Sequence, residues 1–429
     1  MRRSPLRSRL PYVNRCTSRA ELLHVLVAPD NFKGSLSAAE VARHITRGLH
    51  AVVGDSLDVV PVPVADGGDG TLDAAFATGF HRVPLTASGP TGEPVETAYA
   101  RRDSDAVVEL ASVCGLQQLP NGQLDPLGAT SLGVGQVLAA ALDAGCRRTV
   151  LGIGGSASTD GGAGMLVGLG ARVLDTADTP LPRGGAALNG VASLDLSGLH
   201  PALNEAEFIV ACDVNNPLYG PNGAAAVYGP QKGATEQDVA TLDEGLRRWS
   251  RVVATATGHD HSSDPGAGAA GGVGFAAVAV LGANLRPGAE LVLDLVGLRD
   301  RLSGCRLVIT GEGSLDEQTL AGKAPLAVAA AARAAGVDVV AIVGQSTLRP
   351  EAAHQAGISA IYPLTDLEPD VDACMANPGP LLERTAATVA RDLVAATSSR
   401  GGRIMHEAAN GGATMQPSRD RGTKRDDGR

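Results

Sequence analysis

Short runs rich in Val, Ile and Leu alternate with alanine-rich stretches along most of the chain, and this alternation constrains the fold more than any other feature. Residues 22–28 (LLHVLVA) predict a buried strand, and residues 37–49 predict a helix capped by Ser37. Such alternation is typical of α/β proteins built on a parallel sheet. The pattern continues with a strand at 57–64 and, near the far end, a strand, a helix and a strand at 306–310, 325–335 and 337–344.

The middle of the chain differs from both ends because its glycine density rises and its motifs crowd together. Strands are predicted there at 106–110, 149–153 and 208–211. We therefore predict two α/β domains: a discontinuous one, Rossmann-like or flavodoxin-like with a parallel sheet, and a second α/β domain inserted in it. The predicted segments are a disordered basic extension at 1–21, the discontinuous domain at 22–65 plus 285–397, the inserted domain at 66–284 and a disordered tail at 398–429.

Charge is distributed unevenly along the 429 residues, whose net charge is −10. The first 20 residues carry six Arg and no acid, whereas residues 21–400 carry 24 basic and 42 acidic side chains. A surface with this excess of acids repels phosphodiester backbones, so nucleic acid is not expected as a partner. Any phosphate that the protein binds must therefore be held by backbone N–H groups, a few placed cations or a metal.

The cysteines indicate the compartment. Six scattered cysteines without a CxxC pair are typical of a reduced, cytoplasmic protein rather than of a disulfide framework. No apolar run reaches the roughly 18 uninterrupted residues of a membrane span, and the basic N-terminal segment lacks the apolar stretch of a signal peptide. We expect a cytoplasmic protein with no membrane partner, and the sequence leaves its oligomeric state open.

The motif APDNFKG, residues 28–34, follows the first predicted strand and carries polar side chains. Asp30 and Asn31 offer side-chain oxygens, and Lys33 offers a mobile positive charge suited to a phosphate or a carboxylate. The alternative is an Asx turn with a solvated lysine. The motif predicts a ligand site or a turn, with equal support for each.

The motif ADGGDGT, residues 65–71, places two carboxylates three residues apart between a strand and a helix. Asp66 and Asp69 can bind Mg²⁺ or accept a proton from a hydroxyl, and the glycines let the backbone approach a ligand. The alternative is that Asp69 caps a helix that begins near Thr71. A single cap does not need two acids and three glycines, so the motif favours a functional loop.

The stretch LGIGGSASTDGGAGM, residues 151–165, joins a predicted strand to a predicted helix. Successive glycines and small hydroxyls at such a point form a nest of N–H donors that binds phosphate. Gly152, Gly154 and Ala157 also fit the pattern G-x-G-x-x-A of dinucleotide sites. No clean βαβ unit follows, and no acid stands about 20 residues further on, so the dinucleotide signal is weak.

Two further motifs follow predicted strands. ACDVNNPL contains Asp213, with Lys232 a little further along the chain, and TGEGSLDEQTLAGK contains Glu312, Asp316 and Lys323. Each motif taken alone is also compatible with helix capping or a turn. Together, the motifs supply metal-binding acids, neutralising lysines and a glycine nest at several strand ends, which is the combination that phosphoryl transfer needs.

Taken in order, the motifs resemble a known family, the bacterial-type glycerate kinases (the glycerate 2-kinase group, type I), and the resemblance covers residues 22–394. It implies ATP-dependent phosphorylation of D-glycerate with Mg²⁺, at the 2-hydroxyl rather than the 3-hydroxyl, by two α/β domains with the catalytic site in the cleft. The motifs that carry it are APDNFKGSLSA, PVADGGDGT, VELASVCGL, GIGGSASTDGGAGM, CDVNNPL, GPQKGA, GAGAAGGVGF and TGEGSLDEQTLAGKAP.

The resemblance also yields a predicted role for each site residue. The catalytic candidates are Lys33, Asp69, Asp213, Asp316 and Lys323; the ATP-binding candidates are Gly154, Gly155, Ser156, Asp160 and Glu312; the substrate-binding candidates are Asp30, Asn31 and Asp66; and the Mg²⁺ ligands are Asp66 and Asp213. A nicotinamide-dependent dehydrogenase of a small hydroxy acid and a non-catalytic phosphometabolite-binding protein stay open as alternatives.

The chain departs from the family pattern at two places. Ser158 and Thr159 precede Asp160 where the family usually has GGSATND, which is a mild polar exchange. Leu124 precedes Asp125 where the family usually has an arginine. If that arginine holds the glycerate carboxylate in the family, the affinity for the substrate, or its identity, differs here.

Overall fold

The fold is built on two separate β-sheets, which the computed structural model describes over residues 23–317, 319 and 323–409. The first sheet has five strands in the order β15-β13-β11-β1-β2, and all neighbouring strands are parallel. Because the strand order reverses between β1 and β11, this is the doubly wound, flavodoxin-like arrangement, with its switch point there. The strands are β1 (Leu23–Pro29), β2 (Leu57–Pro61), β11 (Cys305–Gly311), β13 (Asp338–Val343) and β15 (Ala360–Pro363).

The second sheet has six strands in the order β10-β9-β6-β5-β4-β3, which follows the chain without a reversal. The ladders from β5 to β10 are parallel, whereas β3, β4 and β5 are antiparallel neighbours. Its strands are β3 (His81–Ser88), β4 (Pro94–Arg102), β5 (Asp105–Glu109), β6 (Arg148–Gly152), β9 (Glu207–Ala211) and β10 (Asn284–Arg286). Two short ladders pair β7 (Arg172–Leu174) with β8 (Ser193–Asp195) and β12 (Ser314–Leu315) with β14 (Gln345–Ser346).

Helices cover both faces of the first sheet because its strands are apolar on both sides. Val25 and Val27 of β1 pack with α1 and α14, whereas Leu26 and Ala28 pack with α11 on the opposite face. The helix α1 begins after Ser37, whose side chain accepts from the backbone of Glu40 in a capping box. The helices of this lobe are α1 (Ala38–Val53), α10 (Leu298–Arg301), α11 (Ala324–Ala334), α12 (Pro350–Gln355), α13 (Val371–Ala376) and α14 (Pro378–Ala409).

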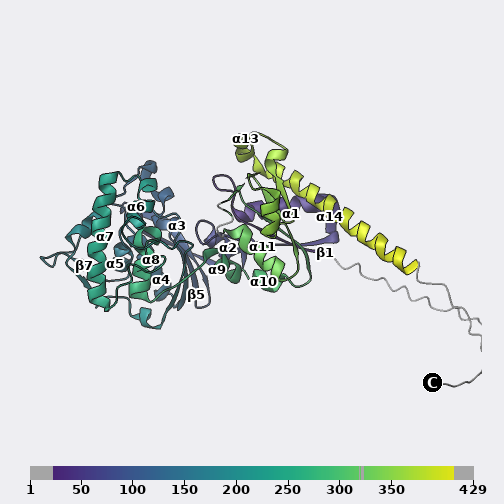
Figure 1. Cartoon of the computed structure of the whole chain (residues 1–429). Helices are drawn as coiled ribbons and strands as arrows, with labels where there is room; N and C mark the ends of the chain where they lie inside the picture. The colour runs from purple at the N-terminus through teal and green to yellow at the C-terminus, as the bar shows by residue number, and fades with distance from the viewer. Residues whose placement is uncertain (1–22, 318, 320–322, 410–429) are drawn as a thin grey trace, which may run out of the picture.

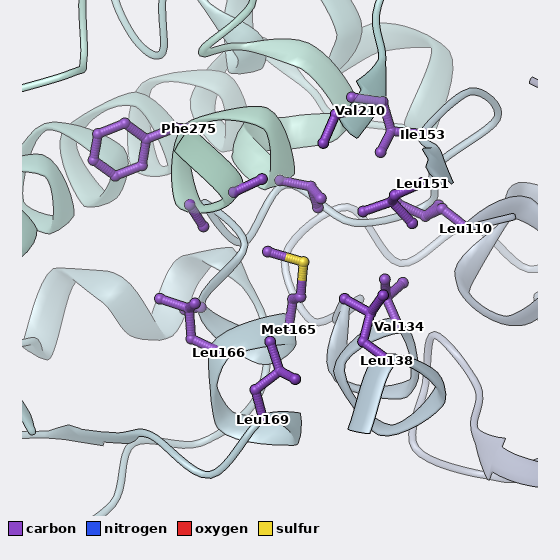
Figure 2. Packing of buried hydrophobic residues seen from close by; sticks show 14 of the residues in the cluster. Leu110, Val134, Leu138, Leu151, Ile153, Met165, Leu166, Leu169, Val210 and Phe275 are labelled. Carbon is purple, nitrogen blue, oxygen red and sulfur yellow. The ribbon is translucent and has the colours of Figure 1, made fainter. Parts of the chain in front are cut away.

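The largest apolar core lies on one face of the second sheet. Figure 2 shows Met165 in this core, with Leu151 and Val210 from the strands and Val134 and Leu138 from α4 around it. The covering helices are α3 (Ala111–Cys114), α4 (Leu132–Asp143), α5 (Ala163–Gly168), α6 (Ala224–Tyr228), α7 (Glu236–Thr257) and α8 (Val273–Leu281).

Two helices, α2 (Thr71–Ala77) and α9 (Gly288–Leu295), lie between the two lobes, as Figure 1 shows. Leu72 and Leu291 pack on the second face of the six-stranded sheet. Ala74 and Val292, on the same two helices, pack into the core of the first lobe. The chain therefore passes from one sheet to the other through helices that belong to both cores, and the loop before α2 lies at the junction.

The α/β class and its parallel sheets are confirmed, and the predicted strands and helices appear within a few residues of their expected bounds. The antiparallel strands β3 and β4 were not predicted. We propose that the two lobes are the two predicted domains; β10 pairs with β9, so the proposed boundary moves from 284 to 286. The predicted tail begins within α14, which continues to Ala409, whereas the predicted extension at 1–21 and residues 410–429 lie outside the described residues.

Over the described part of the chain, no helix is both long enough and apolar enough to cross a bilayer.

Candidate active site

The switch point of the first sheet opens into a cavity of about 220 Å³, which we call the switch-point pocket. Asp30 follows β1 and Glu312 follows β11, so the reversal of strand order brings together two residues that are far apart in the sequence. Ligands of open α/β sheets bind at this position. The lining residues are Asp30, Asn31, Phe32, Lys33, Ser35, Asp66, Glu312, Gly313, Ser314, Lys323, Gly344, Gln345, Leu364, Val371, Cys374, Met375 and Pro378.

Asp30 is an acid in an unfavourable environment. It is only 5% exposed, and burial raises its pKa to about 8, with the charge of Asp66 acting in the same direction. The backbone N–H of Asn31 donates to Asp30 Oδ1 at 2.6 Å, which opposes this shift. The carboxyl group therefore binds a proton, or a cation, more readily than an ordinary aspartate does.

Glu312 is held by groups from its own loop. Thr319 Oγ1 donates to Glu312 Oε1 at 2.6 Å, and Lys323 Nζ lies 3.5 Å from Glu312 Oε2. Burial raises the pKa of Glu312, while the two partners lower it. Asp316 accepts from the N–H of Thr319 at 3.3 Å and is not among the residues that line the pocket. Asp316 thus shapes the turn that brings Thr319 to Glu312.

The loop 66–70 joins the first lobe to α2, and its two acids lie in different surroundings. Asp66 lines the switch-point pocket and also a second pocket on the other lobe. Asp69 lines neither of them; its carboxylate accepts from Gln117 Nε2 at 3.3 Å, and its backbone oxygen accepts from Asn31 Nδ2 at 2.9 Å. Asp69 does not cap α2, because the N-cap residue is Gly70.

The second pocket, also of about 220 Å³, lies at the carboxyl ends of β6 and β9, and we call it the glycine-loop pocket. Gly154 and Gly68 pack backbone to backbone: a Cβ on Gly154 would lie 2.6 Å from the Cα of Gly68. Among the described residues, the N–H groups of Gly154, Gly155 and Ser156 have no hydrogen-bond acceptor. The lining residues are Asp66, Gly67, Gly68, Ile153, Gly154, Gly155, Ser156, Ala211, Cys212, Asp213, Val214, Tyr228, Gln231, Lys232, Ala269 and Ala270.

The predicted glycine nest therefore lines a pocket, but the dinucleotide pattern lacks its structural context. β6 ends at Gly152, and α5 begins only at Ala163. The fingerprint requires a helix that starts directly after the strand. This argues against the dehydrogenase alternative.

Lys232 is the best candidate for a functional residue among those that the sequence-based assignment of site residues omitted. Its side chain is buried, and Nζ donates to Ser156 Oγ at 2.9 Å and to the carbonyl oxygen of Ser158 at 2.5 Å. Burial lowers the pKa of Lys232 to about 7, although the charge of Asp160 opposes the shift. A buried amine beside unpartnered N–H groups is an anion-binding arrangement.

A signal for Lys232 was present in the composition. Only four of the 36 basic residues are lysines, and each of the three that the structure describes lines one of the two pockets: Lys33, Lys232 and Lys323. Lysine differs from arginine in being a compact point charge with a shiftable pKa. In a chain that otherwise uses arginine, the three described lysines therefore lie where this property is useful.

Asp213 follows β9 and lies at the border of the glycine-loop pocket. Its Oδ1 accepts from the N–H of Gly288, the first residue of α9, at 2.8 Å. Desolvation raises the pKa of Asp213, and the charge of Asp66 adds to this effect. Two acids that repel each other in this way suit a shared cation.

Two carboxylates, those of Asp66 and Asp213, are available for the predicted Mg²⁺. Over the described residues, no three or more His, Cys, Asp or Glu side chains form a metal-binding group. Mg²⁺ at phosphate sites is usually held by one or two carboxylates together with phosphate oxygens and water. Asp66 and Asp213 supply such a pair of carboxylates, so the ion would depend on the phosphates for its remaining ligands.

Asp160 was predicted to bind the nucleotide, but the structure does not bring it to the cleft. It is 1% exposed, and it accepts from Ser131 N at 2.8 Å, from Ser131 Oγ at 2.9 Å and from the N–H groups of Gly162 and Gly164. These donors lie at the starts of α4 and α5. Asp160 thus joins the two helices, which support the glycine loop, and we assign it a framework role.

Glu109, which was not singled out in the sequence, holds the start of α2. It is the last residue of β5, and its Oε2 accepts from the N–H of Leu72 at 3.0 Å. Burial raises the pKa of Glu109 to about 7, with the hydrogen bond from Leu72 opposing the shift. Both interlobe helices therefore begin at an acid from the six-stranded sheet, α2 at Glu109 and α9 at Asp213.

Leu124 lies beside the glycine-loop pocket. It is 46% exposed, and a Cβ on Gly233, next to Lys232, would lie 2.8 Å from the Cβ of Leu124. The neighbouring Asp125 is occupied elsewhere, since its Oδ2 lies 3.3 Å from Arg183 Nη1. An apolar side chain therefore stands beside this pocket, at the position where the resemblance led us to expect an arginine.

Acids, lysines and a glycine nest at the facing strand ends of two sheets define the class: an α/β enzyme built for phosphoryl transfer. Comparison with known proteins agrees. Residues 25–394 match the model of the glycerate kinase family. The chain therefore belongs to the glycerate kinase family, and the predicted enzyme class, a phosphotransferase with an alcohol group as acceptor, is confirmed.

Individual relatives are similar over almost their whole length. A glycerate kinase of Bacillus subtilis strain 168 is 40% identical over 374 residues, which cover 86% of this chain and 98% of that protein. A glycerate 2-kinase of Escherichia coli K12 is 42% identical over 344 residues, or 79% of this chain and 90% of that protein. A crystal structure of a protein assigned as glycerate kinase 2 from Salmonella typhimurium LT2 has a TM-score of 0.76 at 41% identity, covering 88% of this chain and 99% of that one.

Proposed function

We propose that this protein transfers the γ-phosphoryl group of ATP to the 2-hydroxyl of D-glycerate, with Mg²⁺ as cofactor, and so forms 2-phosphoglycerate. The observation that carries the proposal is that two pockets, one on each lobe, share Asp66 as a lining residue. A kinase needs two ligand sites that meet at one point of transfer. The name of the E. coli relative, glycerate 2-kinase, favours the 2-hydroxyl over the 3-hydroxyl.

Anionic oxygens would be bound mainly in the glycine-loop pocket. The N–H groups of Gly154, Gly155 and Ser156 lie unpartnered there, and Lys232 supplies a positive charge beside them. Lys33 and Lys323 lie on the other side of Asp66, in the switch-point pocket. We assign these groups to the stabilisation of charge on the phosphoryl group as it moves from donor to acceptor.

The proton of the reacting hydroxyl needs an acceptor, and Asp30 is best suited to that role. Burial and the nearby Asp66 raise its pKa to about 8, so its carboxylate is a stronger base than an ordinary aspartate. Asn31, which contacts both Asp30 and the loop of Asp69, fixes the position of this base. Asp30 thus combines its predicted place beside the substrate with proton transfer.

Asp66, which lines both pockets, and Asp213, which lines the glycine-loop pocket, would hold the Mg²⁺. A bound Mg²⁺ neutralises charge on the phosphate groups and fixes their orientation. The hydrogen bond from the N–H of Gly288 orients the carboxylate of Asp213 and would link the ion site to the start of α9. We further propose that the protein acts in the cytoplasm on small molecules alone.

A coupled assay tests the proposal. The purified protein is incubated with D-glycerate, ATP and Mg²⁺, and enolase is added first alone and then together with phosphoglycerate mutase. We expect formation of phosphoenolpyruvate with enolase alone, because enolase accepts 2-phosphoglycerate directly. Product that requires the mutase would assign the 3-hydroxyl, and the absence of product with verified coupling enzymes would overturn glycerate as the acceptor.

A further inference from the structure

The switch-point pocket has two chemically different ends. Asp30, Lys33, Glu312 and Lys323 make one end polar, next to Asp66. The other end is apolar, and its residues come from the loop after β1, the segment after β15, α13 and the start of α14: Phe32, Leu364, Val371, Cys374, Met375 and Pro378. A ligand that fills this pocket must therefore carry charge at one end and an apolar surface at the other.

D-Glycerate does not meet that requirement. Each of its three carbons carries oxygen, so it has almost no apolar surface to bury, and burying its polar groups against Leu364 or Met375 would cost free energy without a return. A purine ring does meet the requirement, because its two flat faces are apolar and only its edge is polar. Met375, which is flexible and polarizable, is well suited to contact such a face.

The pocket also contains groups for the polar edge of a base. Gln345 and Ser314 lie on the neighbouring short strands β14 and β12, and both line the pocket. The backbone N–H of Gln345 donates to the carbonyl oxygen of Gly313 at 3.0 Å, and among the described residues no hydrogen bond engages its side-chain amide. An amide both donates and accepts, which matches the alternating donor and acceptor edge of adenine.

We propose that the apolar end of the switch-point pocket binds the purine base of the nucleotide donor, so that the triphosphate passes Lys33 and Lys323 and reaches Asp66. The glycine-loop pocket then holds the acceptor, with its reacting hydroxyl directed to Asp66, where the two pockets meet, and towards the base Asp30 on the other side of that junction. This inference rests on the proposed function, since it names the donor site of that reaction. It places donor and acceptor on different lobes.

The test separates binding of the base from binding of the phosphates. Met375 is 47% exposed at the rim of the pocket, so Met375→Glu adds charge there without opening the core. The dissociation constants of ADP and of inorganic pyrophosphate are measured by calorimetry for both proteins. We expect Met375→Glu to weaken ADP binding at least about tenfold, and to leave pyrophosphate binding within about twofold. Val52→Glu is the matched control, because Val52 is an exposed apolar residue of α1 that does not line the pocket. This variant should change neither dissociation constant.

Each outcome decides the inference separately from the proposed function. Unchanged ADP affinity in Met375→Glu would overturn the base site, whether or not the coupled assay detects glycerate kinase activity. Selective loss of ADP affinity would support the base site even if the assay detected no 2-phosphoglycerate, and would then direct the search to another acceptor. A Gln345→Ala variant gives a second readout: we expect ADP affinity to fall severalfold and the preference for ADP over GDP to narrow.

Discussion

The switch-point pocket and the glycine-loop pocket share Asp66, but the chain forms them in different ways. The first arises from topology: β1 and β11 are neighbours although nearly 300 residues separate them, and the reversal of strand order opens the space between the loops that follow them. The second sheet has no reversal, because its strands follow one another in chain order. Its pocket arises instead from loops whose glycines allow backbone to approach backbone.

This difference indicates which changes each pocket tolerates. In the switch-point pocket the strand order creates the space, and side chains such as Lys33 and Met375 decide what fills it. In the glycine-loop pocket the space and three of the donors beside Lys232 are made by backbone, so adding one methyl group disturbs the site. The first pocket should therefore respond to changes of side-chain chemistry, and the second to changes of backbone packing.

The largest expected effect tests whether the two pockets really meet at one residue. Asp66→Asn removes the carboxylate that both pockets share, and we expect kcat to fall about 10³-fold with the circular dichroism spectrum unchanged. Asp69→Asn, three residues away and outside both pockets, is the matched control, with a loss below about tenfold. Equal losses in the two variants would restore the catalytic role that the sequence assigned to Asp69.

A pair of glycine substitutions tests the contrast between topology and backbone packing. Gly154→Ala places a Cβ 2.6 Å from the Cα of Gly68, so the loops must shift, and we expect about a 100-fold loss of kcat/KM. Gly313→Ala in the switch-point pocket meets its nearest atom, Phe32 Cα, at 3.6 Å, which is ordinary contact. We expect that variant to stay within about threefold of the parent in steady-state kinetics. Similar losses of kcat/KM in Gly154→Ala and Gly313→Ala would contradict the proposed difference between the two pockets.

Lys232 provides a sharper test of the glycine-loop pocket. We expect Lys232→Met to lower kcat/KM about 30-fold, in line with a lost charged hydrogen bond. Lys232→Arg should not restore it, because a planar guanidinium does not reproduce the bonds of the compact ammonium to Ser156 and Ser158. Pyrophosphate binding by the parent should weaken as the pH rises through about 7, where burial places the pKa of Lys232. Affinity that depends on pH in the same way in Lys232→Met would exclude Lys232 as the titrating group.

Glu109, at the junction between the lobes, is expected to affect turnover least and to act mainly on the stability of the fold. Burial raises the pKa of Glu109 from 4.5 to about 7, so the folded protein binds a proton there more tightly than the unfolded chain. Its contribution to stability is therefore full below pH 4.5 and is lost as the pH rises to about 7, by about 3 kcal/mol. Glu109→Gln keeps an acceptor for Leu72 and should lack this decline in urea unfolding measured from pH 4.5 to 8. If the free energy of unfolding depended on pH in the same way in the parent and in Glu109→Gln, the raised pKa could not be assigned to Glu109.

Much of the fold and part of the site follow from local sequence. Asp30, Asp213 and Glu312 could be found because each lies within two residues of the end of a recognisable strand, and carboxyl ends of parallel strands meet at one edge. The rarity of lysine draws attention to Lys232, but its contact with Ser156, like that of Glu109 with Leu72, joins residues far apart in the sequence and arises only through packing. The strand order of the first sheet was open for the same reason.

Asp160 is a residue for which the local motif predicted a ligand contact that the structure does not favour. Its glycine-rich surroundings are those of a phosphate loop, yet its carboxylate turns inward to the backbone N–H groups of two helices. A local motif does not reveal whether a side chain points into a cleft or into the framework behind it. The conformation of a loop with many glycines depends on what packs against it.

A crystal structure with a non-hydrolysable ATP analogue, D-glycerate and Mg²⁺ tests the central claim most directly. The account predicts density for the base in the apolar end of the switch-point pocket, the terminal phosphate beside Asp66, and glycerate in the glycine-loop pocket near Lys232. A base bound against Tyr228 and Ala270 in the glycine-loop pocket, with glycerate beside Met375, would contradict it.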